Sequence, residues 1–328
     1  MNFKLINEVI RMLIGTKRTD AYFIQKLKEL QANFPEVEVS YGDALKINDV
    51  EVLITSRITN EELDKASNLK ILIIPFTGVN NLPLERLKAR NIALINSHAH
   101  APIVALRAVT LGLALLGRVV ELHKQLEKGM WKGFDETSAW TAILNKKVGL
   151  LGLGAIGLNI VKYLEPYNPH YITLSRYQSK IENKHNWTYY DTIDELCSNS
   201  DIMFVSLPLT PETKGIIDKN ILNKMRDKYL VNVGRGELIV EEDFYTALKN
   251  NMLKGAAIDV WYQYPEKGRI NLPSKYPFHE LSNVILSPHV AGMSDLTQKL
   301  VSDEIIDNLR YYFENKRFKY TVDLDRAY

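Results

Sequence analysis

Along most of this chain, short runs of consecutive apolar residues alternate with segments whose apolar residues recur at helical spacing. In the first third, four runs predict strands, at 37–39, 52–54, 71–74 and 92–95. Segments with helical periodicity accompany them, at 20–30, 60–66 and 83–89. Unbroken apolar runs are typical of strands buried on both faces, and intervening helices are typical of a parallel sheet. This part of the chain is therefore expected to form an α/β unit.

The same pattern resumes after residue 147 and predicts a second doubly wound sheet. Its strands are expected at 148–151, 171–174, 188–190, 202–205, 229–233, 256–260 and 284–286. A single long helix over 102–128, with Pro102 in its first turn and Gly129 near its end, is expected to connect the two units. A last helix at 297–313 is expected to return to the first unit, which gives domains of 1–97 plus 296–328 and of 98–295.

Composition narrows the class of protein without identifying a reaction. A length of 328 residues favours two domains, and 46% hydrophobic with 24% charged residues is ordinary for a soluble globular protein. A net charge of +2 gives no reason to expect a nucleic acid or a membrane as partner. The longest apolar stretch, Ala108–Leu116, is too short to span a bilayer. One cysteine, Cys197, excludes an internal disulfide, and Arg11 and Lys17 interrupt any signal-peptide pattern, so a cytoplasmic protein is expected.

The most informative stretch is a glycine pattern placed between two predicted strands. The run Lys147–Leu151 leads into Gly152-Leu153-Gly154-Ala155-Ile156-Gly157, followed by a helical pattern and a second run that ends at Leu174. A lone G-x-G-x-x-G also occurs in ordinary turns, but strand, turn, helix and strand in this order indicate a dinucleotide site. The first glycine permits a sharp turn, the second a close approach to pyrophosphate, and the third close packing of the helix on the sheet.

Ligands of doubly wound sheets bind beyond the carboxyl ends of the strands, so the residues that follow each strand are the candidates for chemistry. Four groups stand at such positions: Ser175-Arg176, Val233-Gly234-Arg235-Gly236, Asp259 and Ser287–Gly292. An arginine between glycines, or a histidine after proline, is by itself typical of a surface loop. Their recurrence at consecutive strand ends behind a nucleotide fingerprint indicates one site.

The residues after the second strand bear on the choice of cofactor. NAD is usually held by an acidic residue about 20 positions past the glycines, where this chain has Ser175 and Arg176, at 18 and 19 residues from Gly157. Arginine can pair with a 2′-phosphate, serine can donate to it, and Lys180 is near. The sequence therefore favours NADP over NAD.

Several of these motifs together resemble the D-2-hydroxyacid dehydrogenase family. The resemblance rests on Lys147–Gly157, Val205–Thr213, Leu230–Gly236, Ala257–Val260 and Ser287–Gly292, and more loosely on Thr55-Ser56-Arg57 and Thr77–Asn80. It implies a Rossmann-type cofactor domain, a flavodoxin-like substrate domain, a cleft between them and a homodimer. The implied reaction is hydride transfer between NAD(P) and a small 2-oxo or D-2-hydroxy acid such as glyoxylate or hydroxypyruvate.

Site residues follow from the resemblance motif by motif. Arg235 would grip the substrate carboxylate and polarise the carbonyl, and His289 would be the general acid of reduction. Ser56 and the backbone N–H groups of Gly78 and Val79 would hold the carboxylate. The residues implied in cofactor binding are Gly152, Gly154, Ala155, Ile156, Gly157, Ser175, Arg176, Leu207, Pro208, Val233, Gly234, Asp259 and Gly292. Asp259 and the Val233-Gly234 backbone would orient the nicotinamide carboxamide.

One departure from the family concerns the partner of His289. The family usually has glutamate, or glutamine in its formate dehydrogenase branch, where this chain has Tyr264. A neutral phenol can orient an imidazole but stabilises its cation less than a carboxylate does. Tyr264 is the preferred orienting group because Pro265 keeps the register of the motif, while Gln263 and Glu266 are the alternatives.

Other features leave functional alternatives open. In place of the Glu-His often found in the linker helix stands Leu106-Arg107, and His98 and His100 have no further ligand set beside them, so no metal site is predicted. Trp131 and Trp140 could reach a partner subunit or simply pack. Asp259-Val260-Trp261 resembles the formate branch, so formate or phosphite oxidation is an alternative, as is an NAD(P)-binding sensor that has lost catalysis.

Overall fold

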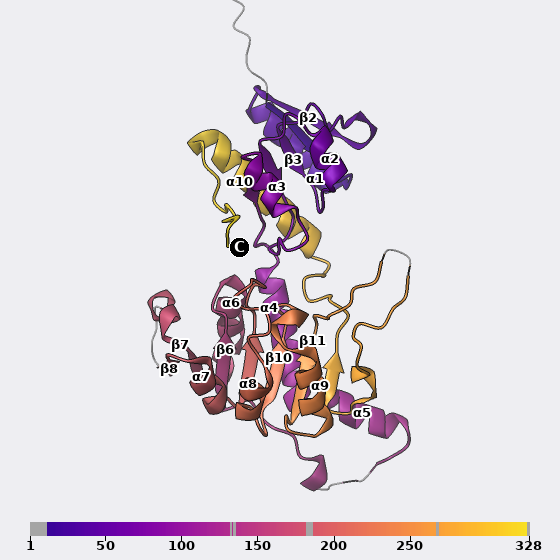
Figure 1. Cartoon of the computed structure of the whole chain (residues 1–328), viewed down its shortest axis with the longest axis vertical. Helices are drawn as coiled ribbons and strands as arrows, with labels where there is room; N and C mark the ends of the chain where they lie inside the picture. Colours follow the sequence, from indigo (N-terminus) through magenta and orange to yellow (C-terminus); the bar gives the residue numbers. More distant parts are fainter. Residues whose placement is uncertain (1–11, 132, 134–135, 182–185, 267–268, 327–328) are drawn as a thin grey trace, which may run out of the picture. The chain divides into compact units, whose positions relative to one another are not determined.

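A computed structural model of the chain contains two parallel β-sheets, each within its own unit (Figure 1). Unit 1 consists of the residues up to His100 and from Ser294 onward, and unit 2 is Ala101–Met293. The structure describes residues 12–131, 133, 136–181, 186–266 and 269–326. Both sheets are doubly wound, so the expected pair of α/β domains is confirmed.

Unit 1 has a five-stranded sheet in the order β2-β1-β3-β4-β5, all parallel, which is the flavodoxin-like order. Its strands are β1 Met12–Thr16, β2 Val37–Tyr41, β3 Val52–Ile54, β4 Ile71–Ile73 and β5 Ala93–Ile95. Strand β1 is absent from the sequence prediction. Gly15 interrupts the apolar pattern of this strand, and glycine in a sequence usually indicates a turn. Here glycine is needed because a Cβ at this position would lie 2.5 Å from the Val50 side chain.

The helices of unit 1 include one from the distant C-terminal segment. They are α1 Ala21–Asn33, α2 Asn60–Lys65, α3 Leu84–Ala89 and α10 Thr297–Asn315. Helix α1 begins at Asp20, whose carboxylate accepts from the Phe23 N–H. Phe23 and Leu27 share a core cluster with Ile305 and Leu309 of α10.

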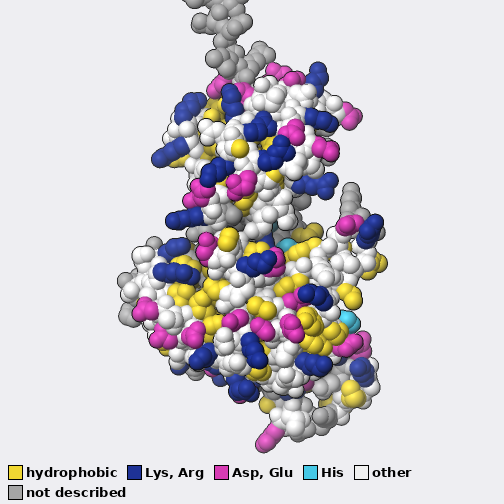
Figure 2. Space-filling view, in the orientation of Figure 1, with side chains coloured by type: hydrophobic (Ala, Val, Ile, Leu, Met, Phe, Trp, Pro, Cys, Tyr) yellow, Lys and Arg dark blue, Asp and Glu magenta, His cyan; other side chains and the backbone are white. Residues whose placement is uncertain are grey.

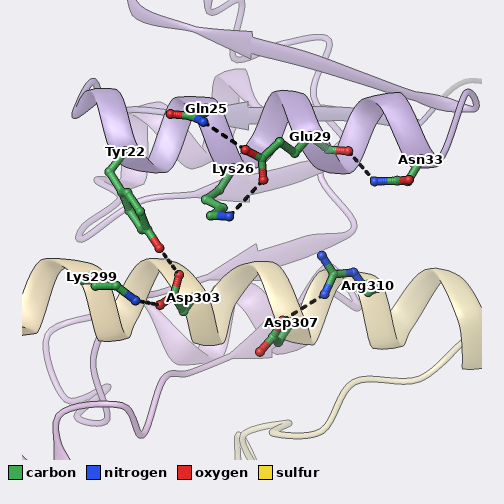
Figure 3. Close-up of polar contacts among 9 residues, drawn as sticks. All are labelled: Tyr22, Gln25, Lys26, Glu29, Asn33, Lys299, Asp303, Asp307 and Arg310. Atoms are coloured by element: carbon green, nitrogen blue, oxygen red, sulfur yellow. Dashed lines mark hydrogen bonds and ion pairs between the residues drawn. The ribbon is translucent and has the colours of Figure 1, made fainter.

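Polar contacts line the outside of the α1 and α10 pair, as Figure 3 shows. The Tyr22 hydroxyl donates to Asp303 at 2.5 Å, and Lys299 reaches the same carboxylate at 2.7 Å. Exposed pairs of this kind contribute about 0–1 kcal/mol each, so the buried apolar side chains hold the two helices together.

Unit 2 has a seven-stranded parallel sheet in the order β12-β11-β10-β9-β6-β7-β8. Its strands are β6 Lys147–Leu151, β7 His170–Leu174, β8 Trp187–Tyr190, β9 Ile202–Val205, β10 Tyr229–Asn232, β11 Gly255–Ile258 and β12 Val284–Leu286. Counted from β6, the order is 3-2-1-4-5-6 with a seventh strand added, which is the dinucleotide-binding arrangement. The order reverses between β6 and β9, and this point is where such sheets bind their ligand.

Both faces of each sheet are buried, as the unbroken apolar runs predict. In β6, Val148 and Leu150 belong to one hydrophobic cluster and Leu151 to the cluster on the other face. In β3, Val52 and Leu53 divide in the same way. The alternation of side chains along a strand therefore fills two cores at once.

Helices of unit 2 cover both faces, and one of them corrects the sequence prediction. They are α4 Ala101–Leu116, α5 Val119–Glu127, α6 Ala155–Leu164, α7 Ile193–Asn199, α8 Lys219–Lys224 and α9 Glu241–Lys249. The single helix expected over 102–128 is wrong: α4 and α5 meet at a bend of 58°. The break falls at Gly117 and at Arg118, whose φ is +52°.

Arg118 stabilises this bend. Its guanidinium pairs with Glu121 at 2.6 Å and donates to the carbonyls of Thr137 and Ala139. The bend also bears on membrane insertion, because no single described helix is long and apolar enough to cross a bilayer, and only α4 and α5 taken together pass on length and composition.

Charged side chains of both signs are interspersed on the face of the molecule drawn in Figure 2. Apolar patches lie between them on unit 2.

We expect Gly157→Ala to destabilise unit 2. A Cβ there would lie 2.3 Å from the carbonyl oxygen of Gly152, so α6 must move away from the turn. Overpacking of this kind costs about 1–3 kcal/mol. Gly154→Ala is the matched control, since nothing lies within 4 Å of its Cβ position. Chemical denaturation of the two variants checks this, and equal stability of both would contradict it.

Candidate active site

The glycine turn after β6 leaves an open cradle at the N-terminus of α6. Gly152 has a φ of +108° and Gly157 lies against Gly152, so neither position has room for a side chain. Gly154, the N-cap of α6, instead faces open space. Ala155, Ile156 and Gly157 form the first turn, whose N–H groups favour an anion. The turn therefore fits the pyrophosphate of a dinucleotide.

A short 3₁₀ segment, Ser175–Lys180, follows β7 directly and carries two cations. The Arg176 guanidinium lies 5.1 Å from the centre of the Tyr177 ring, and the Lys180 ammonium lies 5.4 Å from it. Both cations are exposed, and no acidic residue occurs in the segment. This strand end is the one where a dinucleotide's adenosine ribose usually binds.

The turn after β10 is fixed by Asn232, a buried residue with no role in the sequence prediction. Its side chain accepts from the Gly234 N–H at 3.1 Å and donates to the Arg235 carbonyl at 3.0 Å. A Cβ on Gly234 would lie 2.9 Å from the carbonyl of Leu207, so the turn packs against the end of β9. Val233 and Leu207 are buried, whereas Pro208 is exposed.

Arg235 projects from this turn as a half-buried cation. Its guanidinium donates to the Gly234 carbonyl at 2.7 Å. Desolvation lowers the pKa of Arg235, and the Tyr264 phenol partly offsets this effect. An arginine remains charged at neutral pH even so, which suits it to bind a carboxylate.

The segment after β12 is held by Asp259, which is 1% exposed. Its carboxylate accepts from the Ser287 hydroxyl at 2.5 Å, from the Val290 N–H at 3.1 Å and from the Ala291 N–H at 2.9 Å. Gly292 follows as a half-buried residue. Asp259 thus fixes the loop that bears His289, and its predicted role toward the nicotinamide stays a prediction.

His289 lies in this clamped loop with a φ of +57°, a conformation rare outside glycine. Surrounding protein atoms desolvate its ring and lower its pKa, and the positive charge of Arg235 lowers it further. Asp259 acts in the opposite direction and raises the pKa. The net effect is a histidine that holds its proton less firmly than usual.

Tyr264 is the candidate partner that contacts His289. The two rings lie 5.1 Å apart between centres at an angle of 54°. The Tyr264 hydroxyl accepts from the Trp261 N–H at 3.2 Å, and burial raises its pKa. Glu266 instead pairs with Arg269 at 3.0 Å, and the Gln263 backbone N–H donates to the Pro273 carbonyl. Of the three candidates, Tyr264 is the one whose ring packs against the imidazole, and its orienting role stays a prediction.

The predicted carboxylate-binding residues lie in unit 1, at one edge of its sheet. Ser56 is exposed shortly after β3, while Gly78 and Val79 follow β4, with the Val79 side chain fully buried. Strands β3 and β4 are paired neighbours, so these residues share the carboxyl edge of unit 1. Their role stays a prediction.

His98 and His100, at the end of unit 1, are part-buried, and desolvation lowers the pKa of both. The His98 ring packs on Tyr320 at 5.0 Å between centres, and the backbone N–H of His98 donates to the Glu304 carboxylate at 2.8 Å. Across the described part of the chain, no three His, Cys, Asp or Glu side chains gather closely enough to hold a metal ion.

Two further residues shape the site of unit 2 without having been predicted to do so. Trp261 donates from its indole to the Ser287 carbonyl at 2.8 Å, and Arg107 of α4 reaches the Ser287 hydroxyl at 3.3 Å. The Nε of Arg107 is buried without a hydrogen-bond partner among the described residues. The position of Trp261 directly after the predicted strand 256–260 is the signal that could have indicated its role, whereas Arg107 lies within the predicted helix 102–128 and carries no such signal.

Comparison with known proteins agrees with this geometry. Residues 109–291 match the model of the D-isomer specific 2-hydroxyacid dehydrogenase, NAD binding domain. Hydroxyphenylpyruvate reductase of Plectranthus scutellarioides is 34% identical over 78% of this chain and 79% of its own length. Glyoxylate/hydroxypyruvate reductase A of Arabidopsis thaliana is 33% identical over 76% and 77%, respectively.

A solved structure of a Pyrococcus horikoshii OT3 protein is similar over the whole fold. It is 30% identical, covers 95% of each chain and superposes with a TM-score of 0.77. Together, the family match, the relatives and the site geometry show that the chain belongs to the D-isomer specific 2-hydroxyacid dehydrogenase family of NAD(P)-dependent oxidoreductases.

Proposed function

We propose that this protein reduces a small 2-oxo acid to the D-2-hydroxy acid, with NADPH as the favoured cofactor. The observation that carries the proposal is that Arg235, Tyr264 and His289 lie together beyond the carboxyl ends of β10, β11 and β12. The Tyr264 phenol interacts electrostatically with Arg235, and its ring contacts the ring of His289. The glycine cradle of the same unit fits the cofactor. The relatives' names, which include glyoxylate and hydroxypyruvate reductases, support the class of substrate.

Arg235 and His289 have separate roles in the proposed reaction. A bound reduced nicotinamide supplies the hydride that the carbonyl carbon receives, and the carbonyl electron pair moves to oxygen. Arg235 binds the substrate carboxylate and stabilises the charge that grows on that oxygen. His289 donates the proton that completes the hydroxyl group. Ser56 and the backbone of Gly78 and Val79 would bind the same carboxylate from unit 1.

Two competing functions fit the site less well. Formate or phosphite oxidation needs no proton donor toward an alkoxide, and the formate branch has glutamine at the position of Tyr264. A sensor without catalysis would have no need of Arg235 and His289 together. The retained acid and carboxylate binder therefore favour reduction.

The preference for NADPH rests on the two cations beside Tyr177. We expect faster oxidation of NADPH than of NADH with glyoxylate or hydroxypyruvate. Arg176→Ala should lower kcat/KM for NADPH about 10–100-fold, since a charge-assisted hydrogen bond contributes about 1.5–3 kcal/mol, and should change NADH use little.

Absorbance at the reduced-nicotinamide band measures both rates. Lys162→Ala is the control, because this cation lies in the last turn of α6, remote from the helix end that faces the phosphates. Preference for NADH would refute the cofactor assignment, and binding without turnover of any 2-oxo acid, formate or phosphite would favour the sensor.

Tyr264 should set the pH range of reduction. The imidazolium form of His289 donates the proton, so the rate falls as pH rises through the pKa of His289. That pKa is lowered, and the fall should occur below the ordinary histidine value of 6.5. Tyr264→Glu places a carboxylate near the ring and should move the fall upward by about one pH unit.

The pH profile of kcat/KM checks this effect. Tyr264→Phe keeps the ring without adding charge, so its profile should stay close to that of the parent. An upward shift in the phenylalanine variant, or none in the glutamate variant, would show that charge at this position does not control His289.

We also propose that the protein is a homodimer built on unit 2. Exposed apolar side chains cluster along α5 and the segment after it: Val119, Leu126, Met130, Trp131 and Trp140 are 51–82% exposed. Such a surface is unusual on a monomer. Light scattering should give the mass of two chains, and Trp131→Ser should weaken association. A single-chain mass at micromolar concentration would contradict the dimer.

A further inference from the structure

Unit 2 has a cavity of about 380 Å³ directly beside the proposed acid. Its lining includes Trp261, Tyr264, Leu272, Phe278, Leu286 and His289. The cavity is therefore formed by the loop after β11 and the end of β12, the same two segments that carry the reacting groups. An engineered cavity of about 150 Å³ holds benzene, so the space here is large enough for an aromatic ring.

The walls of this cavity are held by hydrogen bonds. The N–H groups of Tyr262 and Gln263 both donate to the Pro273 carbonyl, at 3.2 and 2.9 Å, which closes the loop after β11. Next to it, the hydroxyl of Ser274 and the N–H of Lys275 donate to Glu241 of α9, at 2.8 and 3.0 Å. The loop is thus fastened to α9 of unit 2.

The described residues that line the cavity include no Asp, Glu, Lys or Arg. Its polar members are amides, hydroxyls and imidazoles, and the rest are aromatic or aliphatic. Tyr264, Leu272 and Leu286 nevertheless expose 48%, 61% and 41% of their surface. Apolar surface gathered in a concave site favours an apolar ligand and disfavours a charged one, which would lose its hydration.

Tyr264 lines this cavity and is also the residue that stands where the family usually has glutamate. A glutamate at this position would bring a carboxylate into the lining, whereas the phenol brings an aromatic face. A phenol at position 264 thus leaves His289 without an added negative charge and leaves the adjacent wall apolar. One substitution alters acid strength and wall chemistry together.

We propose that this cavity binds the side chain of the substrate, and that the substrate is a 2-oxo acid with an apolar, aromatic-sized side chain. The inference rests on the proposed reductase function and narrows its substrate class. The carbonyl end stays with Arg235 and His289, and the side chain attached to it occupies the space lined by Tyr264 and Leu272. A second carboxylate or a phosphate on the side chain is disfavoured.

Three substrates test the proposal with the full-length protein and NADPH. Phenylpyruvate should give a kcat/KM at least tenfold above that of glyoxylate, which has no side chain, and of 2-oxoglutarate, whose side chain is charged. Turnover of all three without this preference would overturn the cavity assignment and leave the reductase function standing. Failure to reduce any 2-oxo acid would overturn both.

Variants of the wall locate the preference. Leu272→Glu and Leu286→Glu should each lower the ratio of kcat/KM for phenylpyruvate to that for glyoxylate at least tenfold. Both side chains are partly exposed, so neither change opens a buried core. Ile270→Glu is the matched control: it adds the same charge to the same loop at a fully exposed residue outside the lining, and the ratio should not change.

The ratio of kcat/KM for phenylpyruvate to that for glyoxylate distinguishes loss of side-chain binding from a general loss of activity or stability. Equal losses for both substrates in Leu272→Glu and Leu286→Glu would mean that the wall supports the fold or the acid and does not bind the side chain. A fall in the ratio for Ile270→Glu of the same size would mean that charge anywhere on the loop is responsible. Either result would overturn the proposal.

Discussion

The carboxylate of Asp259 is the contact on which the geometry of the site depends most. It accepts three hydrogen bonds from Ser287, Val290 and Ala291, and so determines the path of the chain around His289. A buried carboxylate is stable only when its oxygens are well satisfied, and here the satisfying donors belong to the loop that must be positioned. Burial of the charge and placement of the acid are thus one interaction.

The exchange of glutamate for Tyr264 separates two properties that a carboxylate would combine. Orientation of an imidazole needs only a surface to pack against, and the phenol ring lies against His289. Stabilisation of the imidazolium needs negative charge, which in the described part of the site comes from Asp259, already engaged with three donors. Arg235 adds positive charge nearby. The histidine is consequently well placed and weakly basic.

The features that could be predicted from the sequence are those whose cause is local. Gly152 and Gly157 are required by the backbone of one turn, and unbroken apolar runs report burial on both faces of a strand, so the fold and the fingerprint follow from neighbouring residues. Strand β1 is not predicted because its Gly15 is required by a close contact with Val50, which is distant in the sequence. The break at Arg118 depends likewise on Thr137 and Ala139.

The partner of His289 shows the same limit at the site itself. Gln263, Tyr264 and Glu266 are close in sequence, and the choice among them depends on how the loop closes on the Pro273 carbonyl. Asn232 is not singled out by the sequence, since a polar residue at a strand end has no distinctive spacing, and Ser287 stands out only as the first residue of the Ser287–Gly292 group. Their role depends on hydrogen bonds with groups that only the folded chain brings close to them.

Unit 1 is built from two segments that are separated in the sequence by unit 2, and this has a consequence for folding during translation. Helix α10 supplies Val301, Ile305, Leu309 and Phe313 to the core that α1 and β1 begin nearly three hundred residues earlier. Unit 2 is contiguous and has all its residues outside the ribosome before α10 appears. Contacts of such long sequence separation form late, so unit 2 is able to fold first, while one face of the unit 1 sheet stays only partly covered, by α1, until α10 is made.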